Sequence, residues 1–154
     1  MSSATTTPTI YVDADACPVK DEALRVAERH GLPLHFVSNS WMRLPDGPLV
    51  KRIIVADGPD AADDWIVEHI GAPDIAVTAD IPLAARCLKK GAQVIGPTGK
   101  PFTEASIGMA LAMRELSAHL RETGESKGYN ASFARQDRSR FLEALELAVR
   151  RARG

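Results

Sequence analysis

Short apolar runs alternate with longer amphipathic segments along residues 9–95, and this alternation constrains the fold more than any other feature. The apolar runs have the nearly continuous hydrophobic character of strands that are buried on both faces. They occupy residues 9–13, 34–38, 50–56, 75–79 and 93–95. Because parallel strands are joined by crossover helices, the alternation predicts βαβ units and a mainly parallel sheet of five strands.

Three segments between these runs carry the signals of helices. Each has apolar residues at helical spacing and ends at a glycine. They span residues 18–31, 60–71 and 82–91. Proline stands at the start of the first and third segments, where a helix tolerates it well. Residues 39–49 show no helical pattern, so the sequence leaves the direction of the third strand open.

After residue 101 the pattern becomes purely helical. One helix is predicted over residues 103–121, and a last one begins at Asp137, with a polar stretch between them. We therefore expect a single-domain, three-layer α/β/α protein that ends in two helices. Residues 9–154 would form this domain, and the small polar residues 1–8 would form a disordered N-terminal tail.

Composition sets few limits on the partners of the chain. The 19 basic and 20 acidic residues give a net charge of −1, so no global charge favours nucleic acid or a membrane surface. No signal-peptide pattern precedes residue 9, and no apolar run approaches the roughly 20 residues of a membrane span. Cys17 and Cys87 lie far apart in the sequence, which fits a reducing compartment. We expect a cytoplasmic protein.

Aspartates follow three of the predicted strands. Asp13 and Asp15 come after the first strand, and Asp80 comes after the fourth. The acids after the third strand are Asp57, Asp60, Asp63 and Asp64. The carboxyl ends of parallel strands meet at one edge of a sheet, where open α/β proteins bind their ligands. Since neighbouring strands lie about 4.8 Å apart, carboxylates at that edge can share one cation.

A divalent-metal site is the interpretation that this pattern favours. Mg²⁺ and Mn²⁺ take oxygen ligands, and such an ion activates water and stabilises phosphate oxygens during hydrolysis. We predict Asp13, Asp60 and Asp80 as catalytic residues. The predicted metal ligands are these three together with Asp15 and Asp64. Helix capping is the alternative for most of these acids, but it accounts poorly for Asp13, which ends an apolar strand and would be buried there.

Two pairs of polar residues are candidates for contact with a substrate. Ser38 and Asn39 follow the second strand and would face the same edge as the aspartates. Lys100 and Arg138 are cations suited to a phosphate backbone. Turn chemistry explains Ser38 and Asn39 equally well, and a solvated protein surface explains the two cations.

Four motifs occur in order along the chain, and together they resemble a known family. The motifs are YVDADACPVK, DGPDAADDWI, VTADIPLAARCLKKGAQVIGPTGK and FARQDRSRFLEAL. They resemble the bacterial YaiI/YqxD family of uncharacterised proteins from residue 9 to residue 150. The resemblance implies a PIN-like fold whose first and fourth strands are adjacent and central. By that likeness Asp13, Asp60 and Asp80 match acids of metal-dependent nucleases, many of which act on RNA.

The chain departs from the PIN-like pattern in one respect. Many PIN-like nucleases carry a further acid two residues after the Asp80 position or after the next strand. Here these places hold Pro82 and the acid-free GPTGK. The YaiI/YqxD family itself implies no particular activity, so the expectation of metal-dependent RNA or DNA cleavage comes from the wider likeness and from fold analogy.

Two other functions are left open by the sequence. DADAC after the first strand also resembles the Asp-x-Asp motif of haloacid-dehalogenase-type phosphatases, in which Asp13 would attack phosphate and Asp15 would act as acid and base. The late acidic pair of those enzymes has no counterpart in VTADIPLA. The other alternative is a non-catalytic module that binds RNA or protein. The apolar stripes of the last two helices also leave a homodimer open.

Overall fold

The computed structural model describes residues 7–56, 58, 60–109, 111–113 and 135–153. Most of the predicted N-terminal tail and the distal part of the helix predicted over residues 103–121 lie outside these ranges. Asp57 lies outside them as well.

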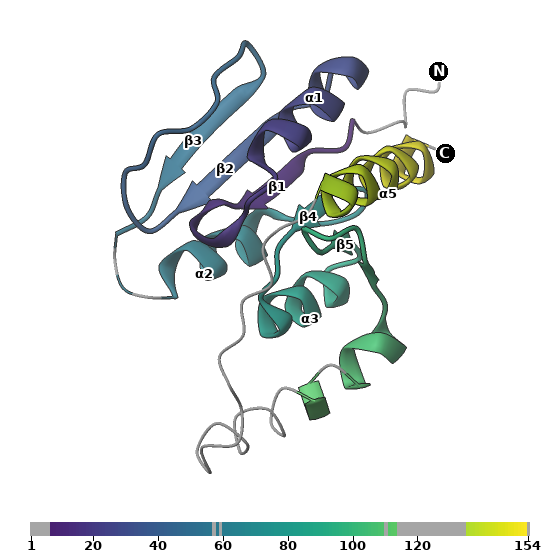
Figure 1. Ribbon diagram of the computed structural model, residues 1–154. Coiled ribbons are helices and arrows are strands. Elements are labelled where there is room, and N and C mark those ends of the chain that lie inside the picture. The colour runs from purple at the N-terminus through teal and green to yellow at the C-terminus, as the bar shows by residue number, and fades with distance from the viewer. Residues whose placement is uncertain (1–6, 57, 59, 110, 114–134, 154) are drawn as a thin grey trace, which may run out of the picture.

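Six strands form one sheet in the order β3-β2-β1-β4-β5-β6 (Figure 1). The strands are β1 (Ile10–Asp13), β2 (Leu34–Ser38), β3 (Val50–Ile54), β4 (Ile75–Val77), β5 (Gln93–Ile95) and β6 (Pro101–Phe102). β1 to β5 are parallel, which confirms the predicted βαβ arrangement and the central, adjacent placement of the first and fourth strands. β3 pairs parallel to β2 and so settles the direction that the sequence left open.

The prediction of five strands was wrong by one. β6 pairs antiparallel to β5 after a tight turn, in which the backbone N–H of Gly96 donates to the carbonyl of Lys100 at 2.8 Å. Gly99 in this turn has φ +92, and a Cβ there would lie 2.6 Å from the carbonyl of Arg140. A two-residue strand is too short to show a hydrophobic period, and its proline fits an edge position.

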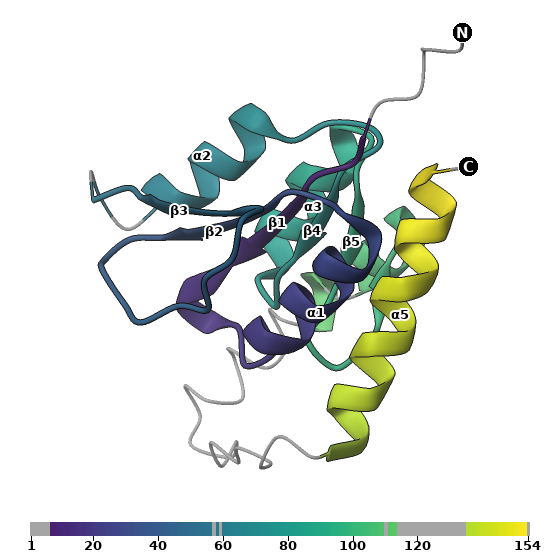
Figure 2. The ribbon, with the colours of Figure 1, turned by 90° about the horizontal axis from the view of Figure 1, so that it is seen from above.

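Helices cover both faces of the sheet. They are α1 (Lys20–His30), α2 (Ala61–His69), α3 (Ile81–Lys89) and α5 (Arg135–Arg153), and residues 104–109 and 111–113 are helical too. α1 and α5 lie on one face of the sheet, and α2 and α3 lie on the other (Figure 2). The predicted three layers are therefore present.

Each face of the sheet is buried in its own hydrophobic core. Ile10 and Val12 of β1 point into the core with Phe141 of α5. Tyr11 points to the opposite face, where it shares the second core with Ile66 of α2. This alternation is the two-residue period of a strand, and burial on both sides explains why the β1 sequence is continuously apolar up to its final aspartate.

The sequence signals for helix ends are only partly realised. α1 ends where Gly31 adopts a left-handed conformation with φ +66, as predicted. It begins at Lys20 and not at Pro18, because a short 3-10 helix, η1 (Ala14–Ala16), and an extended residue at Cys17 come first. This detour after β1 positions the acidic loop described below.

Candidate functional site

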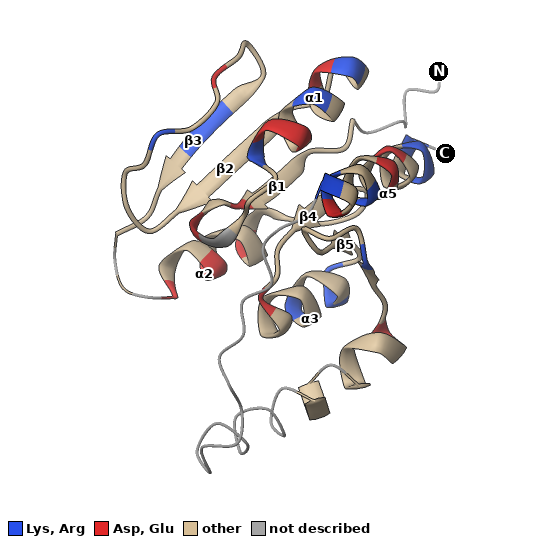
Figure 3. Cartoon of the chain, in the orientation of Figure 1, with Lys and Arg blue, Asp and Glu red and all other residues tan. Residues whose placement is uncertain are grey.

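Acidic side chains gather at the carboxyl ends of the central strands. Figure 3 shows them on the loop after β1 and at the starts of α2 and α3. Register explains the convergence, since Val12 of β1 lies opposite Val77 of β4 in a parallel pair. Asp13 and Thr78, the next residues along, therefore reach the same edge of the sheet.

Asp13 is a buried carboxylate at the end of the central strand. It is only 8% exposed, and its Oδ2 accepts a hydrogen bond from the Thr78 hydroxyl at 2.9 Å. Burial raises the pKa of Asp13, and the hydrogen bond from Thr78 opposes part of that rise. The carboxylates of Asp15 and Asp80 raise the pKa further. A charge at this position is thus unfavourable unless a cation or more donors neutralise it.

Asp80 belongs to the same hydrogen-bond network. Its backbone N–H donates to the Thr78 hydroxyl oxygen at 3.0 Å, and its Oδ1 accepts from the backbone N–H of Leu83 at 2.9 Å. Asp80 is therefore a helix cap, as the alternative interpretation of the sequence held. Its charge also acts on Asp13. Because a carboxylate has two oxygens with several lone pairs, capping leaves it able to bind a cation.

The first turn of α2 adds two acids. Asp60 is the residue before the helix and is exposed, whereas Asp63 is half-buried. Burial raises the pKa of Asp63 to about 6. The carboxylates of Asp80, Asp13 and Asp60 also raise this pKa, and the guanidinium of Arg86 lowers it. These shifts show that acids from β1, α2 and α3 lie within electrostatic reach of one another.

Asp15 connects the first strand to the second. Its Oδ2 accepts a hydrogen bond from the backbone N–H of Asn39 at 2.8 Å. The side-chain oxygen of Asn39 in turn accepts from the backbone N–H of Ala62 at 3.1 Å. Asn39 thus joins the loop after β1 to the start of α2. Its predicted contact with a substrate stays a prediction.

Asp64 turns toward a basic partner. Its Oδ1 lies 3.0 Å from Nη1 of Arg86 on α3, in a half-exposed ion pair. The neighbouring Asp63 carries the electrostatic coupling to Asp13, Asp60 and Asp80. One residue along a helix is a rotation of about 100°, so two adjacent aspartates serve different neighbours, and sequence alone gave no reason to choose between them.

The other predicted substrate contacts lie in varied settings. Ser38 is fully buried, and its hydroxyl donates to the carbonyl of Ser40 at 2.9 Å. Arg138 donates to the carbonyl of Pro18 at 2.9 Å and to the carboxylate of Glu22 at 3.1 Å, which ties α5 to α1. Lys100 is exposed beside α5 and lines a cavity of about 600 Å³ with Asp137, Arg140 and Glu143.

The acidic edge fits a cation that has few protein ligands better than a cation that protein ligands enclose. In the described part of the chain, no three carboxylate, imidazole or thiol groups are grouped closely enough to hold a metal ion as they stand. Mg²⁺ is usually bound through one or two carboxylates and keeps several waters or takes phosphate oxygens. Burial and, to a smaller extent, the neighbouring carboxylates raise the pKa values of Asp13 and Asp63, and a bound cation would offset both effects.

Two members of the site lack a distinctive sequence signal. Thr78 is a single hydroxyl inside an apolar strand end, and only its pairing with Asp13 gives it significance. In the sequence, Asp63 is only one of the acids that follow the third strand. Its position three residues after Asp60 was the available clue, because residues spaced by three share a helix face.

The fold and the acidic edge together define a three-layer α/β protein with carboxylates gathered at the ends of its parallel strands. Comparison with known proteins gives the family. Residues 11–151 match the family described as "Uncharacterized BCR, YaiI/YqxD family", and the chain belongs to this family.

Bacterial relatives are similar along nearly their whole length. A "UPF0178 protein" of Parvibaculum lavamentivorans is 63% identical over 144 residues, which cover 94% of this chain and 95% of the relative. One from Rhodospirillum rubrum is 63% identical over 141 residues, with 91% and 94% coverage. One from Bradyrhizobium sp. is 56% identical over 151 residues, with 98% and 92% coverage.

None of the helices in the described ranges combines the length and the hydropathy of a membrane span.

Proposed function

We propose that this protein is a divalent-metal-dependent phosphodiesterase that cleaves nucleic acid, with RNA as the first substrate to test. The observation that carries the proposal is the buried carboxylate of Asp13, coupled to the acids of two neighbouring helix starts. Structural acids are normally paired or solvated, whereas strongly perturbed acids at the ligand-binding edge of a sheet are typical of functional sites. The resemblance to PIN-like nucleases supports the same conclusion.

Asp13 and Asp80 are the carboxylates that would hold the ion, with Asp60 and Asp63 contributing through charge. We place Asp63 in this group ahead of Asp64, because Asp64 is paired with Arg86. Bound Mg²⁺ or Mn²⁺ would supply Lewis acidity toward a phosphate oxygen and a lowered pKa for a bound water. A PIN-like reaction scheme gives Asp15 no fixed role, and its bond to Asn39 makes it a support for the loop.

The protein's own residues contribute positioning and proton transfer. Thr78 fixes the orientation of the Asp13 carboxylate through its hydroxyl. Asp63 has a pKa of about 6, so its carboxyl group is ionised at neutral pH. Because this pKa lies near neutral pH, the carboxylate is suited to accept a proton from an attacking water. Asp80 is held in place by its cap to Leu83. These roles need no histidine.

The phosphatase alternative is less well supported by the geometry. It requires Asp13 as a nucleophile, but the Thr78 hydroxyl donates into that carboxylate and burial favours its protonated form. It also requires Asp15 as acid and base, and Asp15 accepts the backbone N–H of Asn39. We therefore test the phosphodiesterase first.

Calorimetric titration of Mg²⁺ and Mn²⁺ at neutral pH tests the metal site directly. We expect saturable binding to the wild type, with affinity reduced at least about tenfold in Asp13→Asn and in Asp80→Asn. Both substitutions keep an oxygen acceptor, for Thr78 and for the helix cap respectively. The matched control is Asp64→Asn, which removes a neighbouring charge that is already paired with Arg86.

Binding that survives both substitutions, or that Asp64→Asn weakens as strongly, would contradict the proposed site. A variant series that binds as expected leads to the second step. Labelled single-stranded RNA is then incubated with wild type and Asp13→Asn, each with Mn²⁺ and with chelator. Cleavage by the wild type alone, and only with the metal, is the expected result.

A further inference from the structure

Residues 41–45 form an extended segment that packs along the molecule just after β2. Met42 and Leu44 pack against the core formed with α1 and α5, and Leu44 is 7% exposed. Trp41 and Arg43 alternate with them and are exposed, Trp41 to 73%. Packed and exposed side chains thus alternate along the segment, which leaves Trp41 and Arg43 on its solvent side.

The exposure of Trp41 is unusual for its residue type. Tryptophan is highly buried on average, because it has the largest apolar surface to remove from water. The other tryptophan, Trp65, is half-buried and follows that rule, since it lies against Tyr11 and His35 and stacks on His69 at a centroid distance of 3.7 Å. The indole of Trp41 is instead presented to solvent, next to Met42, which packs against the core.

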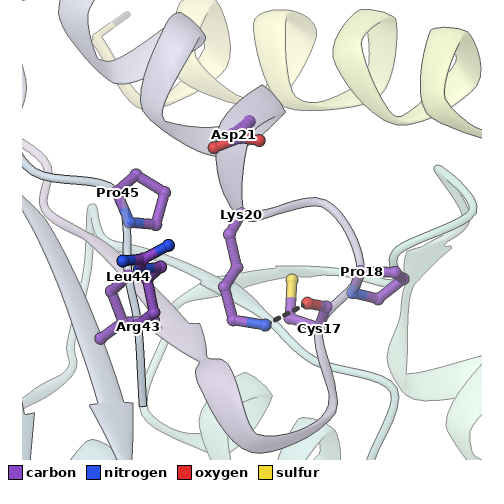
Figure 4. A pocket seen from close by; sticks show the side chains of 7 residues that line it. All are labelled: Cys17, Pro18, Lys20, Asp21, Arg43, Leu44 and Pro45. Atoms are coloured by element: carbon purple, nitrogen blue, oxygen red, sulfur yellow. Dashed lines mark hydrogen bonds between the residues drawn. The ribbon is translucent and has the colours of Figure 1, made fainter.

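A cationic cavity lies next to this segment. It has a volume of about 460 Å³ and is lined by Arg43, Leu44 and Pro45 on one side and by residues of the α1 start on the other. Figure 4 shows the Lys20 side chain extended between these two walls, with its Nζ turned toward the carbonyl of Cys17. That hydrogen bond measures 2.6 Å. An ammonium has three donors, so Lys20 can still donate to an anion.

The cavity adjoins the aspartate site. Cys17 and Lys20 stand on the loop and helix that follow Asp13 directly. The positive charge of Lys20 lowers the pKa of Asp13, against the larger effect of burial, which places the ammonium within electrostatic reach of the buried carboxylate. Among the described residues, Asp21 is the one acid that lines the cavity, and Figure 4 shows it on α1, turned away from the Lys20 ammonium.

We propose that Trp41, Arg43 and Lys20 form a subsite for one nucleotide of single-stranded nucleic acid, with the base stacked on Trp41 and a phosphate held by Arg43 and Lys20. The inference deepens the proposed function, on which it rests, by naming the form of the substrate and the residues that hold it beside the aspartates. Single-stranded nucleic acids are bound elsewhere by the same pairing of aromatic platforms and basic grooves.

The combination of an indole with two cations favours a single strand over other phosphate ligands. A free phosphate, or a phosphorylated metabolite without an aromatic ring, has no use for an exposed indole. In a duplex the base faces are already stacked and paired, so they are not available to Trp41. An unpaired strand offers both a base face and a phosphate.

Fluorescence anisotropy of a labelled single-stranded RNA of about 12 nucleotides, within the site size of single-strand binding proteins, tests the subsite. All titrations are made with chelator, so that neither cleavage nor metal binding enters. We expect Trp41→Ala to weaken binding by roughly 5- to 100-fold, the range for loss of one stacked base, and Trp41→Phe to retain most of it. The matched control is Trp65→Phe, which we expect to bind as the wild type does.

The salt dependence of the same binding tests the two cations. Each phosphate contact in a single strand contributes about 0.7 to the slope of log affinity against log salt concentration. We expect Arg43→Ala and Lys20→Ala each to reduce the slope by about that amount. Arg150→Ala, which removes an arginine that is 72% exposed and pairs with Glu146 on α5, should leave the slope unchanged. Arg43 forms no hydrogen bond or ion pair with the other described residues, so Arg43→Ala stays informative if Lys20→Ala disturbs the Cys17 loop.

Three outcomes would overturn the subsite: no binding of the strand by the wild type, unchanged affinity in Trp41→Ala, or equal competition by a duplex or by inorganic phosphate. These results are independent of the metal titration. If the wild type binds no metal but binds RNA in a way that depends on Trp41, the phosphodiesterase is refuted and the subsite is supported. If the wild type binds metal but its RNA binding does not depend on Trp41, the subsite is refuted and the proposed metal site is supported.

Discussion

The seam between α1 and α5 and the acidic edge of the sheet use the same kinds of charged residue in opposite ways. At the seam, Glu146 accepts from His30 at 2.8 Å and lies 3.3 Å from both Arg29 and Arg150. These partners lower the pKa of Glu146, although burial acts in the other direction. At the acidic edge, burial and then the carboxylates of Asp80, Asp13 and Asp60 raise the pKa of Asp63 to about 6.

The difference separates an arrangement of charges that stabilises an ionised carboxyl group from one that does not. Oppositely charged neighbours stabilise the ionised form of a carboxyl group and add modestly to the stability of the fold. Like-charged neighbours make it unfavourable, so such a group persists at the ligand-binding edge of a sheet at some cost in stability. Substitutions at the seam should therefore lower the stability of the fold. Substitutions of acids at the acidic edge should raise that stability and weaken metal binding.

The largest effect is expected from the apolar contacts beneath the seam. Phe141 of α5 is completely buried in the core shared with β1. Phe141→Ala should destabilise the protein by about 3–5 kcal/mol through lost transfer energy and a cavity, which lowers the melting temperature by roughly 10 °C. Thermal unfolding followed by circular dichroism measures this change.

The control for that variant lies on the same helix. Leu147 is 48% exposed, and Leu147→Ala should change stability by less than about 0.5 kcal/mol. Folded Phe141→Ala should still bind Mn²⁺ at low temperature. Loss of metal affinity in the folded variant would show that the two regions are not separable.

A substitution at the acidic edge is expected to raise the stability of the protein, by an intermediate amount. The pKa of Asp63 in the folded protein, about 6, lies above its ordinary value of 3.8. Its contribution to stability is therefore full below pH 4 and is lost as the pH rises through 6. Without metal at pH 7.5, Asp63→Asn should raise stability by about 1 kcal/mol after allowance for solvent screening, or about 2–4 °C in melting temperature.

The same substitution at low pH provides the sign check. At pH 4 the wild-type Asp63 is protonated in the folded state, so the gain from Asp63→Asn should vanish. Asp64→Asn, one residue further along, should be nearly neutral at both pH values because a half-exposed ion pair contributes little. Equal gains in stability from Asp63→Asn and Asp64→Asn at pH 7.5 would mean that the ionisation of Asp63 is not specifically unfavourable.

The smallest effect is expected from the charged tie across the seam. Arg138→Gln removes the bonds to the carbonyl of Pro18 and to the carboxylate of Glu22. This half-exposed contact should contribute about 0.5–1 kcal/mol, a change of about 1–4 °C. RNA affinity, measured by anisotropy, should be unchanged. A tenfold loss of affinity would instead support the substrate contact that the sequence suggested for Arg138.

Much of the fold was predictable because its signals are local. The apolar runs of β1 and β2 are long enough to show that both faces are buried, and Gly31 marks the end of α1. β6 was not predictable, since two residues carry no period and its pairing depends on the turn at Gly99, which fits against the backbone of Arg140. The direction of β3 likewise depends on a partner strand that residues 39–49 do not specify.

The candidate site was predictable in location but not in membership. Asp13 stood out because a carboxylate at the end of an apolar strand has to be buried, and the structure buries it. The choice between Asp63 and Asp64 depends on which side of α2 faces the sheet edge. Arg86, on a different helix, takes Asp64.

The sequence by itself determined that strands and helices alternate, that the strands are buried on both faces, and that acids follow three of them. These properties follow from residue order and hydrophobicity within a few neighbouring positions. Only the tertiary structure decided that the Thr78 hydroxyl meets the Asp13 carboxylate and that Lys20 stands beside Arg43. Such pairs are made by strand register and loop path, which bring residues together across long stretches of chain that no local pattern encodes.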